Sequence, residues 1–120
     1  MSIIVVWLLF ALGIGHVLFG LVKFKGPLTE AAAAGFVGEF KAPEVRRTAF
    51  WFTLFGLPLM LAGHVAVRAV GAGDLGLLKV IGGYVLVTAL IGVAAIPRSP
   101  FWLALVLAPL LVAAGFGLLP

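Results

Sequence analysis

The sequence contains no cysteine, and charged side chains make up only 10% of its 120 residues. The absence of cysteine excludes disulfides, thiolate nucleophiles and cysteine-ligated metal or iron–sulfur sites. The shortage of charge argues against an ordinary soluble domain, in which roughly a quarter of the residues are charged. No Asp or Glu lies within the long apolar runs. That absence argues against an ion-coupled exporter, because such proteins place an ionisable group inside the membrane.

Long apolar runs dominate what is present. Apolar residues make up 64% of the chain, and the mean hydropathy is +1.31. A helix needs about 20 apolar residues to cross about 30 Å of hydrocarbon, and four runs approach this length. The sequence therefore predicts an all-α integral membrane four-helix bundle, with residues 1–120 as a single transmembrane domain. The predicted spans are 3–22, 48–70, 75–96 and 101–119.

The segment between the first two predicted spans is too short and too polar to cross a membrane. Leu28, Ala32, Phe36 and Phe40 recur every four residues, which predicts a short interfacial helix over 28–40. Glycines within the segment weaken a helix by about 1 kcal/mol each, so a plain loop is the alternative.

The distribution of basic residues predicts the orientation in the cell membrane. Six Lys or Arg residues flank one side of the predicted spans and two flank the other. Cytoplasmic loops carry the excess, so we expect loop 23–47 inside and both termini outside. The six are Lys23, Lys25, Lys41, Arg46, Arg47 and Arg98, and the two are Arg68 and Lys79. Trp51 and Trp102 fall near the inner interface and Trp7 near the outer one, as in an aromatic belt.

Apart from Arg68 and Lys79 near the span ends, the ionisable side chains within the predicted spans are His16, His64 and Tyr84. At about 1.5 Å per residue, His16 lies at the depth of Thr53 and His64 at the depth of Tyr84. We therefore predict two polar layers, His16–Thr53 and His64–Tyr84, in place of one shared site. Contact with a proton or ligand, or with a metal or haem, is the alternative role for each histidine. No HExxH spacing supports a metal site, so no metal and no cofactor is assigned.

The net charge of +4 could suggest a nucleic acid partner. The charges lie in short loops between apolar spans, so we expect no nucleic acid and a lipid bilayer instead. Lys41, Arg46, Arg47 and Arg68 are candidate contacts for lipid headgroups, although topology and snorkelling account for them as well. Pairs of glycines one heptad apart, at 13 and 20 and at 56 and 63, indicate close helix packing.

Several motifs resemble those of a family of small bacterial four-helix membrane proteins that is known only as a domain of unknown function. The motifs are Gly15-His16, the run Ala49–Pro58, Gly63-His64 and the run Pro97–Trp102. The overall layout also resembles the broader DoxX-like group, some of whose members are linked to quinone-associated oxidation. The resemblance implies an architecture and no catalytic residue.

The first functional hypothesis is a non-enzymatic accessory or lipid-binding bundle, alone, as a homo-oligomer or with a membrane-protein partner. The alternative is a membrane subunit of a quinone- or haem-linked redox system, with His16 or His64 near the redox group. No residue pattern identifies a reaction, so no catalytic residue is assigned.

Overall fold

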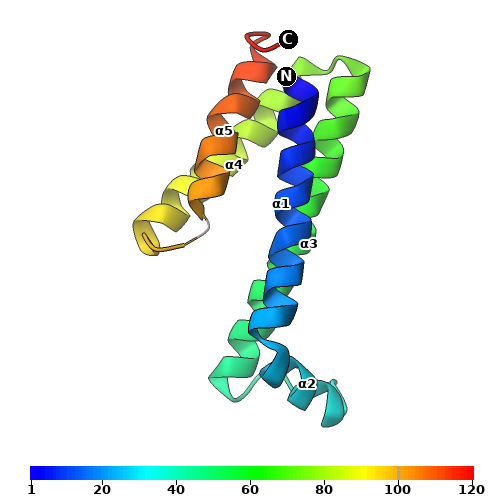
Figure 1. Cartoon of the computed structure of the whole chain (residues 1–120), viewed down its shortest axis with the longest axis vertical. Helices are drawn as coiled ribbons and strands as arrows, with labels where there is room; N and C mark the ends of the chain where they lie inside the picture. Colours follow the sequence, from blue (N-terminus) through cyan, green and yellow to red (C-terminus); the bar gives the residue numbers. More distant parts are fainter. Residues whose placement is uncertain (100) are drawn as a thin grey trace.

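A computed structural model describes residues 1–99 and 101–120 of the chain. Within these ranges the protein is all-α, with five helices and no strand (Figure 1). The helices are α1 (Ser2–Lys23), α2 (Lys25–Ala33), α3 (Glu44–Ala72), α4 (Leu75–Ala95) and α5 (Phe101–Gly115).

Helices α1 and α3 run alongside each other and make the most extensive contact in the molecule. The predicted glycine pairs, Gly13 with Gly20 and Gly56 with Gly63, lie in this interface. A Cβ added at Gly13 would lie 2.5 Å from the backbone nitrogen of Met60, and the other three glycines leave equally little room. Small residues let membrane helices approach closely, so the heptad glycines bring these two helices together.

Helices α4 and α5 form a second pair on the same principle. A Cβ added at Gly82 would lie 2.9 Å from the backbone nitrogen of Val112. A side chain at Gly92 would overlap the ring of Phe101 across the turn that joins the two helices. The turn is stabilised where the indole nitrogen of Trp102 donates a hydrogen bond of 2.7 Å to a backbone carbonyl.

The two pairs meet at the end of the molecule that holds both termini. In Figure 1 the α4–α5 pair leans away from α1 and α3 toward its other end, where residues 96–99 lie. The main cluster of buried residues lies at the shared end. Its members are Val5, Val6, Leu9, Ala66, Ala69, Leu78, Ile81, Leu107, Leu111 and Ala114.

The count of four spanning helices is not matched. Three helices, α1, α3 and α4, are long and apolar enough to cross a membrane, which indicates membrane association. Helix α5 is apolar but has only 15 residues, where the sequence predicted a span over 101–119. The chain leaves the helix after Gly115 and turns at Gly117, whose φ of +73° is incompatible with an α-helix.

The short helix after α1 also differs from the predicted range 28–40. Helix α2 begins at Lys25 and ends at Ala33. Beyond it the backbone turns sharply, with positive φ at Gly35, Phe36 and Gly38. The predicted four-residue row therefore extends only over its first half, because a left-handed backbone conformation interrupts a right-handed helix.

Candidate functional site

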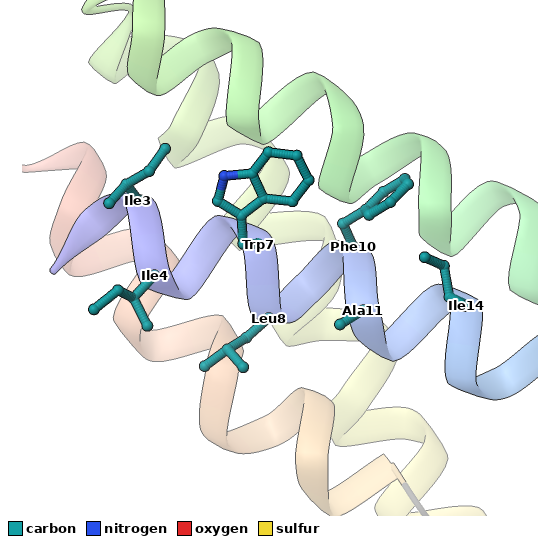
Figure 2. Close-up of a pocket in the computed structure, with 7 residues that line it drawn as sticks. All are labelled: Ile3, Ile4, Trp7, Leu8, Phe10, Ala11 and Ile14. Carbon is teal, nitrogen blue, oxygen red and sulfur yellow. The ribbon is translucent and has the colours of Figure 1, made fainter.

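A shallow hollow lined by apolar side chains lies on α1. It has a volume of about 580 Å³, and almost all of its lining is carbon. Figure 2 shows the side chains projecting from this one helix, with Trp7 and Phe10 on one side and Ile4 and Leu8 on the other. The full lining is Ile3, Ile4, Trp7, Leu8, Phe10, Ala11 and Ile14. A surface without polar groups can hold only an apolar ligand.

His64 lies beside this hollow. Its ring meets the ring of Phe10 edge to face, with centroids 6.2 Å apart. The side chain is exposed, and the described residues offer it no hydrogen-bond partner. Tyr84, its predicted partner, is 76% exposed on α4, and the hydrogen bond expected between the two is not formed. Helices α3 and α4 make little contact and diverge from the turn that joins them (Figure 1).

His16 makes a different contact from the one predicted. Its Nε2 donates a hydrogen bond of 2.8 Å to the backbone carbonyl of Phe52 on α3. The imidazole also stacks on the Phe52 ring, at a centroid distance of 4.2 Å and an interplanar angle of 20°. The ring of Phe55 also contacts the imidazole, with centroids 5.5 Å apart and an interplanar angle of 65°. The imidazole is therefore held by one backbone acceptor and two rings.

Thr53, the predicted partner of His16, lies one residue further along α3. Its hydroxyl is buried against Gly20 and has no hydrogen-bond partner within the described ranges. Thr53 lies opposite Gly20, four residues further along α1 than His16, and the histidine bonds to the carbonyl of the neighbouring residue Phe52. Whether either polar layer contributes to function stays a prediction.

The two histidines do not converge on one site. His16 contacts Phe52 and Phe55, whereas His64 contacts Phe10. Phe10 and His16 are six residues apart on α1, which places the two imidazoles at levels separated by about 9 Å. Among the described residues, no group of three His, Asp or Glu side chains is arranged to hold a metal ion.

The basic side chains at the α2 end fall into two kinds. Lys23 is surrounded by three rings, those of Phe19, Phe24 and Phe52, each 5.5–5.8 Å from its ammonium nitrogen. Such cation–π contacts hold the lysine against the protein. Arg46 forms an ion pair of 3.2 Å with Glu39.

The other candidate headgroup contacts are exposed. Lys41 and Arg47 lie on the surface near the start of α3, and Arg68 lies near its far end. Of the four, only Arg46 has an acidic partner within the described ranges. Their contact with lipid headgroups stays a prediction.

Two features of this site escaped the sequence analysis. The hollow on α1 follows from apolar residues spaced three and four apart, but a first membrane helix commonly carries such residues on every face. The acceptor for His16 is a main-chain carbonyl, and every residue has one. Only the packing of α1 on α3 selects the carbonyl of Phe52.

Three comparisons with known proteins bear on the chain. A family model described as "Family of unknown function (DUF6463)" matches residues 1–116. The comparison with curated proteins and the comparison with solved structures gave no match.

Proposed function

The chain belongs to this family of unknown function, and we propose that it is a non-enzymatic, multi-pass membrane protein that binds the acyl chain of a membrane lipid. The hollow on α1 carries the proposal, because its lining is apolar and lies within the first span. Burial of apolar surface is favourable at about 25 cal/mol per Å², but lipid already surrounds a spanning helix. Hydrophobicity therefore does not favour the hollow over the surrounding lipid. The shape of the hollow must instead select an acyl chain that fits between the side chains of Trp7 and Leu8.

His64 supports this proposal by adding one polar group beside the hollow. An exposed imidazole in an apolar medium has an uncompensated desolvation cost unless it finds a hydrogen-bond partner. A lipid whose acyl chain lies in the hollow would present an ester or phosphate oxygen near the bilayer surface. The ligand class is accordingly an amphiphile with an apolar chain and a hydrogen-bonding head.

We also propose four membrane passes, as in the predicted bundle. Helix α4 is long enough to cross, so residues 96–99 and residues 71–74 lie on opposite sides of the membrane. The backbone nitrogen of Ser2 donates a hydrogen bond of 2.9 Å to the carbonyl of Pro120, which places both termini together. Helix α5 must therefore return across the membrane. Because it is shorter than a full span, either local thinning of the bilayer or the flanking segment 116–120 makes up the missing length.

The proposed four-pass layout, with a helical excursion after the first pass, is also that of DoxX-like proteins, and we propose that relation at the level of the fold alone. A bacterial source is likewise part of that proposal. The layout assigns no redox role here, because fold does not imply function. The two histidines stand at different depths, so a redox group shared between them has no geometric support.

Photo-crosslinking of the full chain in vesicles tests the proposal. The probe is a phospholipid with a photoreactive group in one acyl chain. We expect the crosslinks to concentrate on residues 3–14, and we expect Ala11→Phe, which fills the hollow, to remove most of them. Ala94→Phe is the matched control, since Ala94 is an exposed alanine at the far end of α4. Crosslinks spread evenly over all exposed apolar residues, unchanged in Ala11→Phe, would refute a lipid site on α1.

A further inference from the structure

The turn that follows α2 exposes apolar side chains where a water-facing loop would carry polar ones. Phe36 is 56% exposed and Val37 is 89% exposed. Positive φ values at Gly35, Phe36 and Gly38 form the turn. A bulky residue rarely adopts a positive φ. We refer to residues 34–40 as the 34–40 turn.

A continuous row of aromatic rings joins the 34–40 turn to α3. The ring centroids of Phe36 and Phe40 are 5.1 Å apart, and those of Phe40 and Phe50 are 5.2 Å apart. Phe50 then meets Trp51 edge to face at 5.2 Å. Trp51 is 62% exposed near the start of α3, where a spanning helix meets the membrane surface. Tryptophan favours the headgroup level of a bilayer, so the row holds Phe36 at that level.

An ion pair fixes the same turn from its other side. Glu39 in the turn accepts a hydrogen bond of 3.2 Å from Arg46 in the first turn of α3. The side chains are only 34% and 18% exposed, which limits screening by water. The 34–40 turn is therefore held against the base of α3. In Figure 1, α2 and this turn project sideways from the lower end of the α1–α3 pair.

The charge around the 34–40 turn is complementary to an anionic surface. Residues 23–47 carry more basic than acidic side chains. Lys23 is held by aromatic rings and Arg46 by Glu39. Lys25, Lys41 and Arg47 remain exposed, and the described part of the chain gives them no acidic partner.

We propose that the 34–40 turn is an interfacial wedge that inserts Phe36 and Val37 into an anionic lipid leaflet. Lys25, Lys41 and Arg47 form its basic rim and contact the lipid phosphates. The occupant is lipid in preference to a second copy of the chain, since two identical basic rims would repel each other. The proposal rests on the proposed function only in requiring that α1 and α3 cross the membrane; it is independent of the hollow on α1.

Single-cysteine fluorescence tests the wedge cleanly, because the natural chain has no cysteine. Val37→Cys and, as a control, Thr29→Cys on the exposed face of α2 are labelled with a polarity-sensitive fluorophore. Each full-length protein is reconstituted into vesicles of phosphatidylcholine, with or without phosphatidylglycerol. The quenchers are headgroup-level nitroxide lipids and aqueous iodide. We expect lipid quenching at position 37, iodide quenching at position 29, and a larger lipid contribution when phosphatidylglycerol is present.

Two further variants separate the parts of the wedge. Removal of one basic side chain near an anionic surface should reduce the ratio of inserted to non-inserted 34–40 turn by about fivefold. We expect this loss for Arg47→Gln in vesicles that contain phosphatidylglycerol, and no loss in vesicles of phosphatidylcholine alone. Phe36→Ser should shift position 37 toward iodide quenching in both vesicles. Arg68→Gln, at the other end of α3, should change neither.

Four results would overturn the wedge. Iodide quenching of position 37 equal to that of position 29 would place the turn in water. Protection of position 37 from both quenchers would assign the turn to protein contact, as would a fluorescence change that scales with protein density in the vesicle. Insertion that is indifferent to phosphatidylglycerol would show that the basic rim does not contact anionic lipid. None of these results alters crosslinking at α1, so failure of the wedge is distinguishable from failure of the proposed function.

Discussion

At the scale of single residues, the contacts between the helices of this protein depend on glycines and on one histidine. Seven glycines lie where an added Cβ would overlap a neighbouring helix or side chain. Gly15 and Gly83 lie within spans as well, yet nothing lies within 4 Å of where their Cβ would be. The closely packed glycines and the open ones differ only in their position in the fold. Substitution by a larger residue should therefore destabilise the protein at the first class and not at the second.

Gly56→Leu should destabilise the protein by about 1–3 kcal/mol, because overpacking forces the close helices apart. A Cβ there would meet the backbone oxygen of Gly13 and the backbone nitrogen of Val17 at 3.0 Å. Gly15→Leu, in open space on α1, is the control and should leave the free energy of unfolding unchanged within about 0.5 kcal/mol. Reversible unfolding in mixed micelles measures both. Equal effects of the two variants would show that α1 and α3 do not pack through these glycines.

His16→Phe should lower the free energy of unfolding by about 0.6 kcal/mol, the average for a hydrogen bond between membrane helices. The phenyl ring keeps the stacking on Phe52 and loses only the bond to its carbonyl. His16→Ala should cost more, because it also removes an aromatic pair worth about 0.5–1.5 kcal/mol. His64→Ala, which loses one edge-to-face contact with Phe10 and no hydrogen bond to the described residues, serves as the comparison and should cost less than His16→Ala in the same micelles. A larger loss at His64 than at His16 would contradict this assignment.

At the scale of elements, the two ends of α3 and the start of α4 have identifiable local causes. Helix α3 starts directly after Pro43 and carries Glu44 in its first turn, where the helix dipole favours a negative charge. It ends at Gly73, whose φ of +69° suits a C-terminal cap. Helix α4 begins at once after Asp74, so the connection between two spans needs only two residues. This short connection keeps α3 and α4 adjacent at that end of the molecule.

Asp74→Ala should lower the free energy of unfolding by about 0.5–2 kcal/mol, which is the usual range for loss of an N-cap. The carboxylate of Asp74 accepts a hydrogen bond of 3.0 Å from the backbone nitrogen of Leu77. Asp74→Asn keeps an oxygen acceptor and should retain most of the stability. Hydrogen exchange at the Leu77 amide, followed by NMR, measures the cap directly. Unchanged protection of that amide in Asp74→Ala would show that the cap is dispensable.

At the scale of the whole molecule, the chain consists of two helix pairs that share a core at one end only. The pairs are joined there by the α3–α4 turn, by the core around Leu9 and Leu111, and by the bond between Ser2 and Pro120. The opposite end holds α2, the 34–40 turn and most of the basic residues. Positive charge is thus segregated along the long axis, as expected for a membrane protein with one orientation.

Single-cysteine labelling in intact cells should place the two ends on opposite sides of the membrane. Gly71→Cys, at an exposed position with no atom near its Cβ, should react with an impermeant maleimide. Thr29→Cys, on α2, should react only after the cells are permeabilised. These positions are preferable to Gly38 and Gly73, whose positive φ would be strained by a side chain. Labelling of Thr29→Cys alone in intact cells would reverse the orientation.

The sequence by itself determined the class of the protein, because an apolar run must bury its backbone polar groups in a helix wherever water is absent. The lack of charge in residues 3–22, the proline and glycine boundaries, and the asymmetry of Lys and Arg are all local properties. The heptad glycines are likewise identifiable as packing positions from their spacing alone, since close approach of two helices needs small residues where they touch. The all-α fold and the three long spans follow from such information.

The tertiary structure alone decided which surfaces meet and which stay open. The choice of the Phe52 carbonyl for His16, the separation of His64 from Tyr84, and the divergence of the α4–α5 pair depend on how helices are oriented about their axes. Depth along the membrane can be counted in residues, but rotation about a helix axis is set by contacts with its neighbours. The hollow on α1 and the aromatic row from Phe36 to Trp51 exist only once those rotations are set.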